Sequence, residues 1–149
     1  MEFQIPPSLK SEHEELHAEL VKAIQAGGEI GKAAQSVAEV LHPHFVKEEE
    51  YALPPLGLLR RLAAGKVLPE MKNVLSMTDR LKRELPQMLE EHQAIVAKLQ
   101  DLVEAAEKEG RTEFAHFSEK LILHAKTEEE VLYPASILVG DCLKLSGWC

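Results

Sequence analysis

Apolar residues recur at alternating steps of three and four along four stretches of this 149-residue chain, and this spacing restricts the fold more than any other feature. In the longest stretch the stripe runs from Val74 through Leu81 and Ile95 to Ala106. Such spacing keeps the apolar side chains on one side of an α-helix, facing a shared seam. Four such helices joined by tight turns predict an all-α, antiparallel, up-down-up-down four-helix bundle.

Glycine and proline mark the ends of the predicted helices, which cover residues from 8 or 11 to 25, then 29–53, 69–110 and 112–133. The first ends at Gly27-Gly28, while Pro54 and Pro134 end the second and the fourth, because proline cannot continue a helix. We expect a short extra helix between the second and third helices. A C-terminal tail, residues 135–149, should add a short helix that packs on the end of the bundle, so that residues 1–149 form one domain.

Two prolines, Pro43 and Pro86, fall inside predicted helices. Each lacks a backbone N–H and crowds the carbonyl group four residues earlier, so we expect a bend at each position. The apolar stripe continues through both positions. We therefore predict one bent helix, rather than two separate helices, at each place.

Composition and charge exclude several classes of protein. The net charge is −8 and Lys and Arg form no clustered face, which argues against nucleic-acid binding. No apolar run approaches the roughly 18 residues of a membrane span. The first residues, MEFQIPPSLK, have neither the basic start nor the apolar stretch of a signal peptide. Cys142 and Cys149 form no disulfide framework, so the expected location is the cytoplasm.

Six residues that commonly bind metals interrupt the apolar seams: His13, His44, Glu48, His92, His124 and Glu128. A buried carboxylate is costly unless it is paired or coordinates a metal. The i, i+4 spacing places His44 beside Glu48, and His124 beside Glu128, on one face of a helix. A lone histidine on an apolar face is usually an ordinary core residue. Six such residues at seam positions together predict a metal site.

These residues belong to a repeat. EHEELHAEL at residues 12–20 matches EHQAIVAKL at 91–99, and HFVKEEEYALP at 44–54 matches HAKTEEEVLYP at 124–134. Within each predicted hairpin the two histidines are about equally far from the turn, so they should meet at one level. The repeat predicts a pseudo-two-fold site of four imidazoles and two carboxylates. The glutamates Glu49, Glu50, Glu129 and Glu130 turn off the seam and are expected at the surface.

The pattern H…HxxxE…H…HxxxE, from His13 to Pro134, resembles the hemerythrin-like (HHE cation-binding) family. That resemblance implies a non-haem di-iron centre, bridged by an oxygen atom and by Glu48 and Glu128. One iron would bind His13 and His44, and the other His92 and His124. Manganese or zinc could substitute for iron in a site of imidazoles and carboxylates.

The sequence departs from the oxygen-carrying hemerythrins, which have an HxxxH pair on the third helix. Here His92 is followed four residues later by Val96, which weakens the case for reversible oxygen carriage. Two residues are candidates for a fifth ligand. His17 lies one turn from His13, and Tyr51 lies seven residues after His44, where the other copy has Val131.

Three classes of function remain open at this point. The first is a redox enzyme that breaks down peroxide or reduces a small oxidant. The second is a module that binds oxygen or nitric oxide, senses oxygen or iron, or stores iron, without turnover. The third is a bundle in which the metal stabilises a surface for a protein partner or a second copy of the chain.

Overall fold

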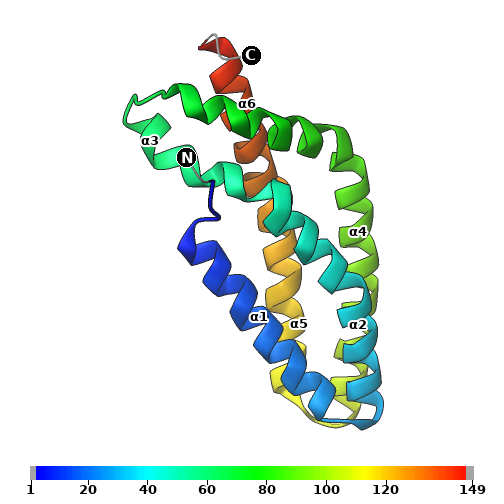
Figure 1. The fold of residues 1–149 in the computed structure, drawn as a ribbon. Coiled ribbons are helices and arrows are strands. Elements are labelled where there is room, and N and C mark those ends of the chain that lie inside the picture. Colours follow the sequence, from blue (N-terminus) through cyan, green and yellow to red (C-terminus); the bar gives the residue numbers. More distant parts are fainter. Residues whose placement is uncertain (1–2, 147–149) are drawn as a thin grey trace.

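The computed structural model describes residues 3–146, and these residues contain helices and no strand. The bundle is formed by four helices: α1 (Pro7–Gln25), α2 (Gly28–Lys47), α4 (Leu75–Lys108) and α5 (Thr112–Thr127). Figure 1 shows them running alternately up and down, with α1 beside α2 and α5, and with α4 beside α2 and α5. The predicted all-α, antiparallel four-helix bundle is confirmed.

Tight glycine turns set the level of the helices in each hairpin. Gly27 and Gly28 have φ angles of 70° and 59°, and Gly110 has a φ of 67°. These left-handed backbone conformations are accessible to glycine at little energetic cost. Because both turns are short, residues that are equally far from a turn face each other across the hairpin, as the repeat predicts.

Both HxxxE stretches leave the α-helical conformation at their glutamate. A π-helical turn, η1, spans Glu48–Ala52 and follows α2, and a second one, η4, spans Glu128–Leu132 and follows α5. A π turn holds an extra residue, so every later side chain is rotated around the helix axis relative to a continuous α-helix. The spacing of apolar residues gave no indication of these turns.

The last helix corrects one predicted boundary. We expected the fourth helix to stop before Pro134, but η4 leads directly into α6 (Tyr133–Leu145). Pro134 lies in the first turn of α6, where a missing backbone N–H and a fixed φ are tolerated. The predicted tail is therefore a helix as far as Leu145. The segment also contains Cys142, which is a free, exposed thiol. Cys149 lies outside the described residues.

The end of the bundle that carries α6 is closed by short helices. The predicted extra helix is present as η2 (Pro54–Leu58) and α3 (Leu59–Ala63), and η3 (Pro69–Val74) leads into α4. Helix α6 packs against α4, η2 and η3. Both internal prolines lie within unbroken helices, as expected. Figure 1 shows α4, which contains Pro86, turning sharply between the part beside α6 and the longer part beside α2.

Apolar layers lie on both sides of the six predicted ligands. Toward the glycine turns the core includes Leu16, Leu20 and Leu99. Toward α6 it includes Tyr51, Met88 and Tyr133. The polar residues in between are thus enclosed by apolar packing. Among the described residues, no helix is both long enough and apolar enough to cross a membrane.

Candidate metal centre

The fold brings all six predicted ligands into one buried layer. The four histidines come from four different helices, and the two glutamates are the first residues of the two π turns. None of the six is more than 5% exposed. Their ligand atoms fall into two groups, one of His44, Glu48, His92 and Glu128 and the other of His13, His124 and Glu128. Within each group these atoms lie within 4.8 Å of one another.

Glu128 connects the two groups. Its Oε1 lies 3.1 Å from His92 Nε2, and its Oε2 lies 3.2 Å from His124 Nε2. Glu48 takes the equivalent place in the first hairpin, with Oε1 at 3.6 Å from the Nε2 atoms of both His13 and His44. Each carboxylate therefore lies between the two histidines of its own hairpin, where it could bridge two cations.

The grouping of histidines differs from the one that the resemblance implies. The resemblance pairs His13 with His44 and His92 with His124. In the structure the closest ring nitrogens belong to His44 and His92, with 3.0 Å between their Nε2 atoms. The two groups combine residues across the hairpins because α2 packs against α4, and α1 against α5. Since Glu48 still faces both His13 and His44, the assignment of histidines to individual ions stays a prediction.

The donor set fits cations of intermediate softness. Four inward-facing atoms are buried and lack a hydrogen-bond partner: His13 Nε2, Glu48 Oε1, His124 Nε2 and Glu128 Oε2. A buried polar atom without a partner costs about 1–3 kcal/mol, so natural proteins rarely leave several in one place. Imidazole and carboxylate donors suit iron, manganese and zinc. The residues present therefore fit a dimetal site.

The sequence comparison agrees with this geometry. Residues 5–136 match the family model of the hemerythrin HHE cation-binding domain, which covers most of the chain. The chain belongs to this family. No curated protein and no solved structure matches it significantly. As an HHE domain with two buried His/Glu groups, it carries a candidate dimetal site at the predicted positions.

The two buried carboxylates of the HHE domain have opposite pKa shifts. Burial and the nearby charge of Glu128 raise the pKa of Glu48 well above its usual value. Burial also acts to raise the pKa of Glu128, but the contacts of its carboxylate with Glu48 and three histidines outweigh it, so that this pKa is lowered. Two carboxyl groups that share one proton behave in this way. Without a metal, the proton on Glu48 compensates part of the negative charge that a cation would neutralise.

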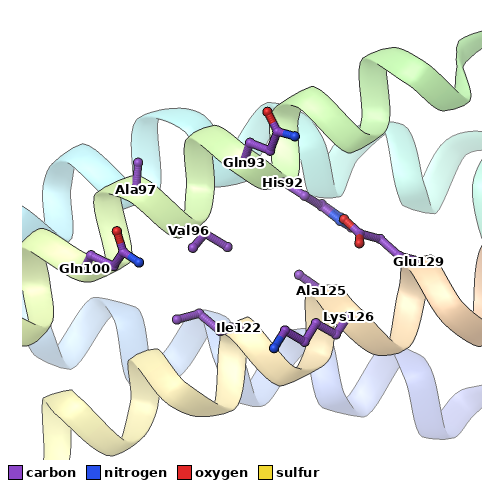
Figure 2. A pocket seen from close by; sticks show the side chains of 9 residues that line it. All are labelled: His92, Gln93, Val96, Ala97, Gln100, Ile122, Ala125, Lys126 and Glu129. Atoms are coloured by element: carbon purple, nitrogen blue, oxygen red, sulfur yellow. The ribbon is translucent and has the colours of Figure 1, made fainter.

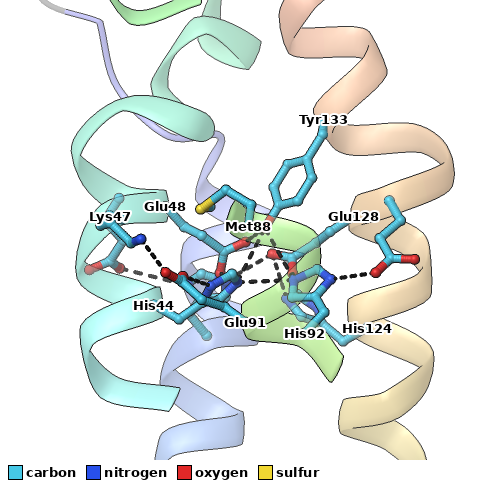
Figure 3. Close-up of polar contacts among 12 residues, drawn as sticks. His44, Lys47, Glu48, Met88, Glu91, His92, His124, Glu128 and Tyr133 are labelled. Carbon is cyan, nitrogen blue, oxygen red and sulfur yellow. Dashed lines mark hydrogen bonds and ion pairs between the residues drawn. The ribbon is translucent and has the colours of Figure 1, made fainter. Parts of the chain in front are cut away.

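An outer carboxylate faces the Nδ1 atom of each histidine. Three of the four distances are hydrogen-bond distances: His44 to Glu91 at 2.7 Å, His92 to Glu129 at 2.9 Å, and His124 to Glu12 at 2.5 Å. The fourth pair, His13 and Glu49, lies 3.8 Å apart. Figure 3 shows several of these contacts around the buried layer. A carboxylate at Nδ1 fixes the imidazole so that Nε2 faces the metal.

The outer carboxylates form a directional ring around the bundle. Glu12 on α1 contacts the histidine of α5, and Glu129, which follows α5, contacts the histidine of α4. Glu91 on α4 contacts the histidine of α2, and Glu49, which follows α2, lies near the histidine of α1. The expectation that Glu49 and Glu129 only face solvent is therefore incomplete. The sequence signal for the ring is the dipeptide Glu-His at 12–13 and 91–92, together with the second glutamate of each EEE run.

The outer ring also affects the protonation of the histidines. Burial acts to lower the pKa of His92 and His124, but the charges and close contacts of Glu128 and of the outer carboxylates outweigh it, so both pKa values are raised. For His44, burial prevails and the pKa is lowered. The ring thus favours positive charge at His92 and His124. A bound cation would supply positive charge at the same place, and the histidines would then be neutral ligands.

Tyr133 is the residue near the ligands that sequence reasoning missed. Its hydroxyl group donates a 2.7 Å hydrogen bond to Glu48 Oε2 and lies 3.2 Å from the Nε2 atoms of His44 and His92 (Figure 3). The comparison of Tyr51 with Val131 assumed continuous α-helices. Because η4 adds a residue after Glu128, the side chain that points at the ligands is Tyr133.

The two candidates for a fifth ligand lie elsewhere. Tyr51 is buried, but its hydroxyl group contacts Met88 Sδ at 3.5 Å, and the Arg80 guanidinium group stacks 4.0 Å from the centre of its ring. His17 is exposed at the surface of α1. His17 is not part of the two ligand groups.

Proposed function

We propose that this domain holds two iron ions, joined by an oxygen bridge and by Glu48 and Glu128, and that it binds or reacts with a small oxidant such as peroxide, oxygen or nitric oxide. The observation that carries the proposal is the pair of buried His/Glu groups that share Glu128 and leave four inward-facing donor atoms without a partner. Manganese or zinc could occupy the same donors.

Bound iron would supply electrons and Lewis acidity at this site. The residues of the chain would bind the ions, orient the ligand side chains and enclose the site. The outer carboxylates hold each imidazole by its Nδ1 atom, and the apolar layers above and below the ligands exclude bulk water. Tyr133 holds a proton between its hydroxyl oxygen and Glu48 Oε2, at the side of the site that faces α6.

Metal analysis of untagged protein, followed by optical spectroscopy, tests the proposal. We expect two iron ions per chain. The double variant His44→Ala/His124→Ala should lose them, while His42→Ala/His116→Ala, which removes two histidines outside the ligand groups, should keep them. Unchanged iron content in the first variant would contradict the assignment.

Mixing the reduced protein separately with oxygen and with peroxide distinguishes the remaining functions. Gas evolution from peroxide indicates turnover, and a stable, reversible charge-transfer band indicates binding. A protein that holds iron and shows neither response would be a metal-stabilised bundle, and the proposed oxidant chemistry would be wrong.

A further inference from the structure

A groove on the outside of the second hairpin ends at the candidate metal centre. This α4–α5 groove has a volume of about 450 Å³. The lining residues that matter here are His92, Val96, Ile122, Ala125, Lys126 and Glu129. Figure 2 shows Val96, Ile122 and Ala125 in the space between the two helices, with the side chain of Lys126 along one edge. The wall near the centre of the groove is thus apolar and made of small or medium-sized side chains.

The sequence repeat identifies the equivalent place on the first hairpin. There His13, His17, His42, Phe45 and Glu49 replace His92, Val96, Ile122, Ala125 and Glu129. Instead of one groove, this side has two smaller hollows of about 300 Å³ and 150 Å³. His17, His42 and Phe45 line both hollows and divide the space that is continuous in the second hairpin, while the larger hollow also reaches His13 and Glu49.

The decisive difference is the pair Phe45 and Ala125. The Phe45 ring stacks on His13, with 3.9 Å between ring centres and an angle of 6° between the planes. This ring covers one whole face of the imidazole. Ala125 has a single methyl group at the equivalent position, so the outer side of His92 faces the groove instead of an aromatic ring.

The inner end of the α4–α5 groove is formed by His92, which belongs to one of the ligand groups. His92 is only 2% exposed, so the groove stops against its ring. The Nδ1 atom of that ring contacts Glu129, which is itself 38% exposed and lines the groove, while Nε2 lies 3.1 Å from Glu128. The ring of His92 and the carboxylate of Glu129 are therefore the side chains that lie between the groove and Glu128.

We infer that the α4–α5 groove is the route by which small ligands reach the metal centre, and that Phe45 closes the equivalent route on the first hairpin. The inference rests on the proposed function. The ligand class is an uncharged or singly negative molecule of the size of a diatomic or triatomic, since the buried ring of His92 leaves no opening for a larger one. Lys126 and Glu129 bring one charge of each sign to the groove, so a neutral molecule, or a small anion that pairs with Lys126, can enter it.

The matched variants Ala125→Phe and Phe45→Ala exchange the two local structures. Azide is the probe, and the rate at which its absorption band forms with the iron-loaded, oxidised protein is measured by stopped flow. A phenyl ring that must move aside adds a barrier like that of an overpacked core, so Ala125→Phe should slow azide association about tenfold or more. Association and dissociation should slow together, with the equilibrium affinity unchanged. Phe45→Ala should leave the rate unchanged or raise it.

Metal content and thermal unfolding are measured for every variant. If Ala125→Phe does not fold, Val96→Phe fills the same groove from α4 and should slow azide in the same way. Folded, iron-loaded Ala125→Phe or Val96→Phe that binds azide at the wild-type rate would overturn the inference and leave the proposed function intact. Wild-type protein that binds no iron would overturn both.

Discussion

The first hairpin, α1 with α2, and the second, α4 with α5, contribute the same kinds of ligand, yet their surroundings differ at three places. Phe45 covers His13, where the second hairpin has Ala125 and an open groove. Tyr133, the first residue of α6 after the second hairpin, contacts the ligands, whereas the repeat places Leu53 at the equivalent position after the first hairpin. Glu128 belongs to both ligand groups, whereas Glu48 belongs to one. The duplicated ligands can thus hold two ions alike, while the unequal surroundings can direct a small molecule to one of them.

The largest difference in metal binding is expected when Glu128 and Glu48, the two carboxylates between the histidines, are replaced one at a time. Glu128→Gln should abolish binding of both ions, because both groups lose a ligand, whereas Glu48→Gln should retain residual binding at the group of His13, His124 and Glu128. Metal content after gel filtration measures both. Equal loss in the two variants would mean that the glutamates are equivalent despite the asymmetric geometry.

The opposite pKa shifts of the two carboxylates predict a pH dependence of metal binding. The pKa of Glu48 is raised, so below that pKa its carboxyl group carries a proton that the cation must displace. Affinity should fall as the pH falls, by up to about tenfold per pH unit for each proton released. Zinc titration calorimetry in buffers of different ionisation enthalpy counts these protons. Glu48→Gln should release fewer protons than wild type, and an equal count would refute a protonated Glu48.

The difference between Tyr133 and Tyr51 gives a smaller effect, measured on the metal-free protein. Tyr133→Phe removes a hydrogen bond to a buried carboxyl oxygen of Glu48, so we expect a loss of about 1–3 kcal/mol in the free energy of unfolding. Tyr51→Phe removes a contact to the sulfur of Met88 and an interaction with the largely exposed carboxylate of Glu84, and should lose less than about 1 kcal/mol. Urea unfolding of both variants checks the order. A larger loss for Tyr51→Phe would restore the view that Tyr51 is the residue that breaks the symmetry.

The sequence predicted the parts of the structure that depend on periodic spacing. The alternating steps of three and four gave the bundle, and the residues that break the apolar stripes gave the six buried His and Glu residues. Spacing alone could not predict the π turns, because the pattern of apolar residues does not show where one turn of a helix contains an extra residue. It therefore placed Tyr51 beside the ligands. The fourth helix was ended before Pro134 for a different reason, because proline usually stops a helix but is tolerated in the first turn of the next one. The outer ring was missed for a related reason, since Glu12 and Glu49 lie at the edge of a seam and their partners are on other helices.

The outer ring provides the finest test of the difference between the hairpins. Glu91 lies 2.7 Å from His44 Nδ1, whereas Glu49 lies 3.8 Å from His13 Nδ1. Removing a hydrogen-bonded carboxylate behind a metal-binding histidine typically lowers metal affinity about 10- to 100-fold. We therefore expect Glu91→Gln to weaken zinc binding by about that factor, and Glu49→Gln to weaken it much less. Competition with a chromophoric chelator measures both affinities.

The exposed Glu50→Gln is the matched control for charge, because it removes a neighbouring negative charge without touching a histidine of the ligand groups. It should leave zinc affinity near the wild-type value. If Glu49→Gln weakens binding as strongly as Glu91→Gln, the 3.8 Å pair closes to a hydrogen bond when the metal binds. In that case the ring is complete in the loaded protein, and the two hairpins differ at Phe45, at Tyr133 and in the sharing of Glu128 by both ligand groups.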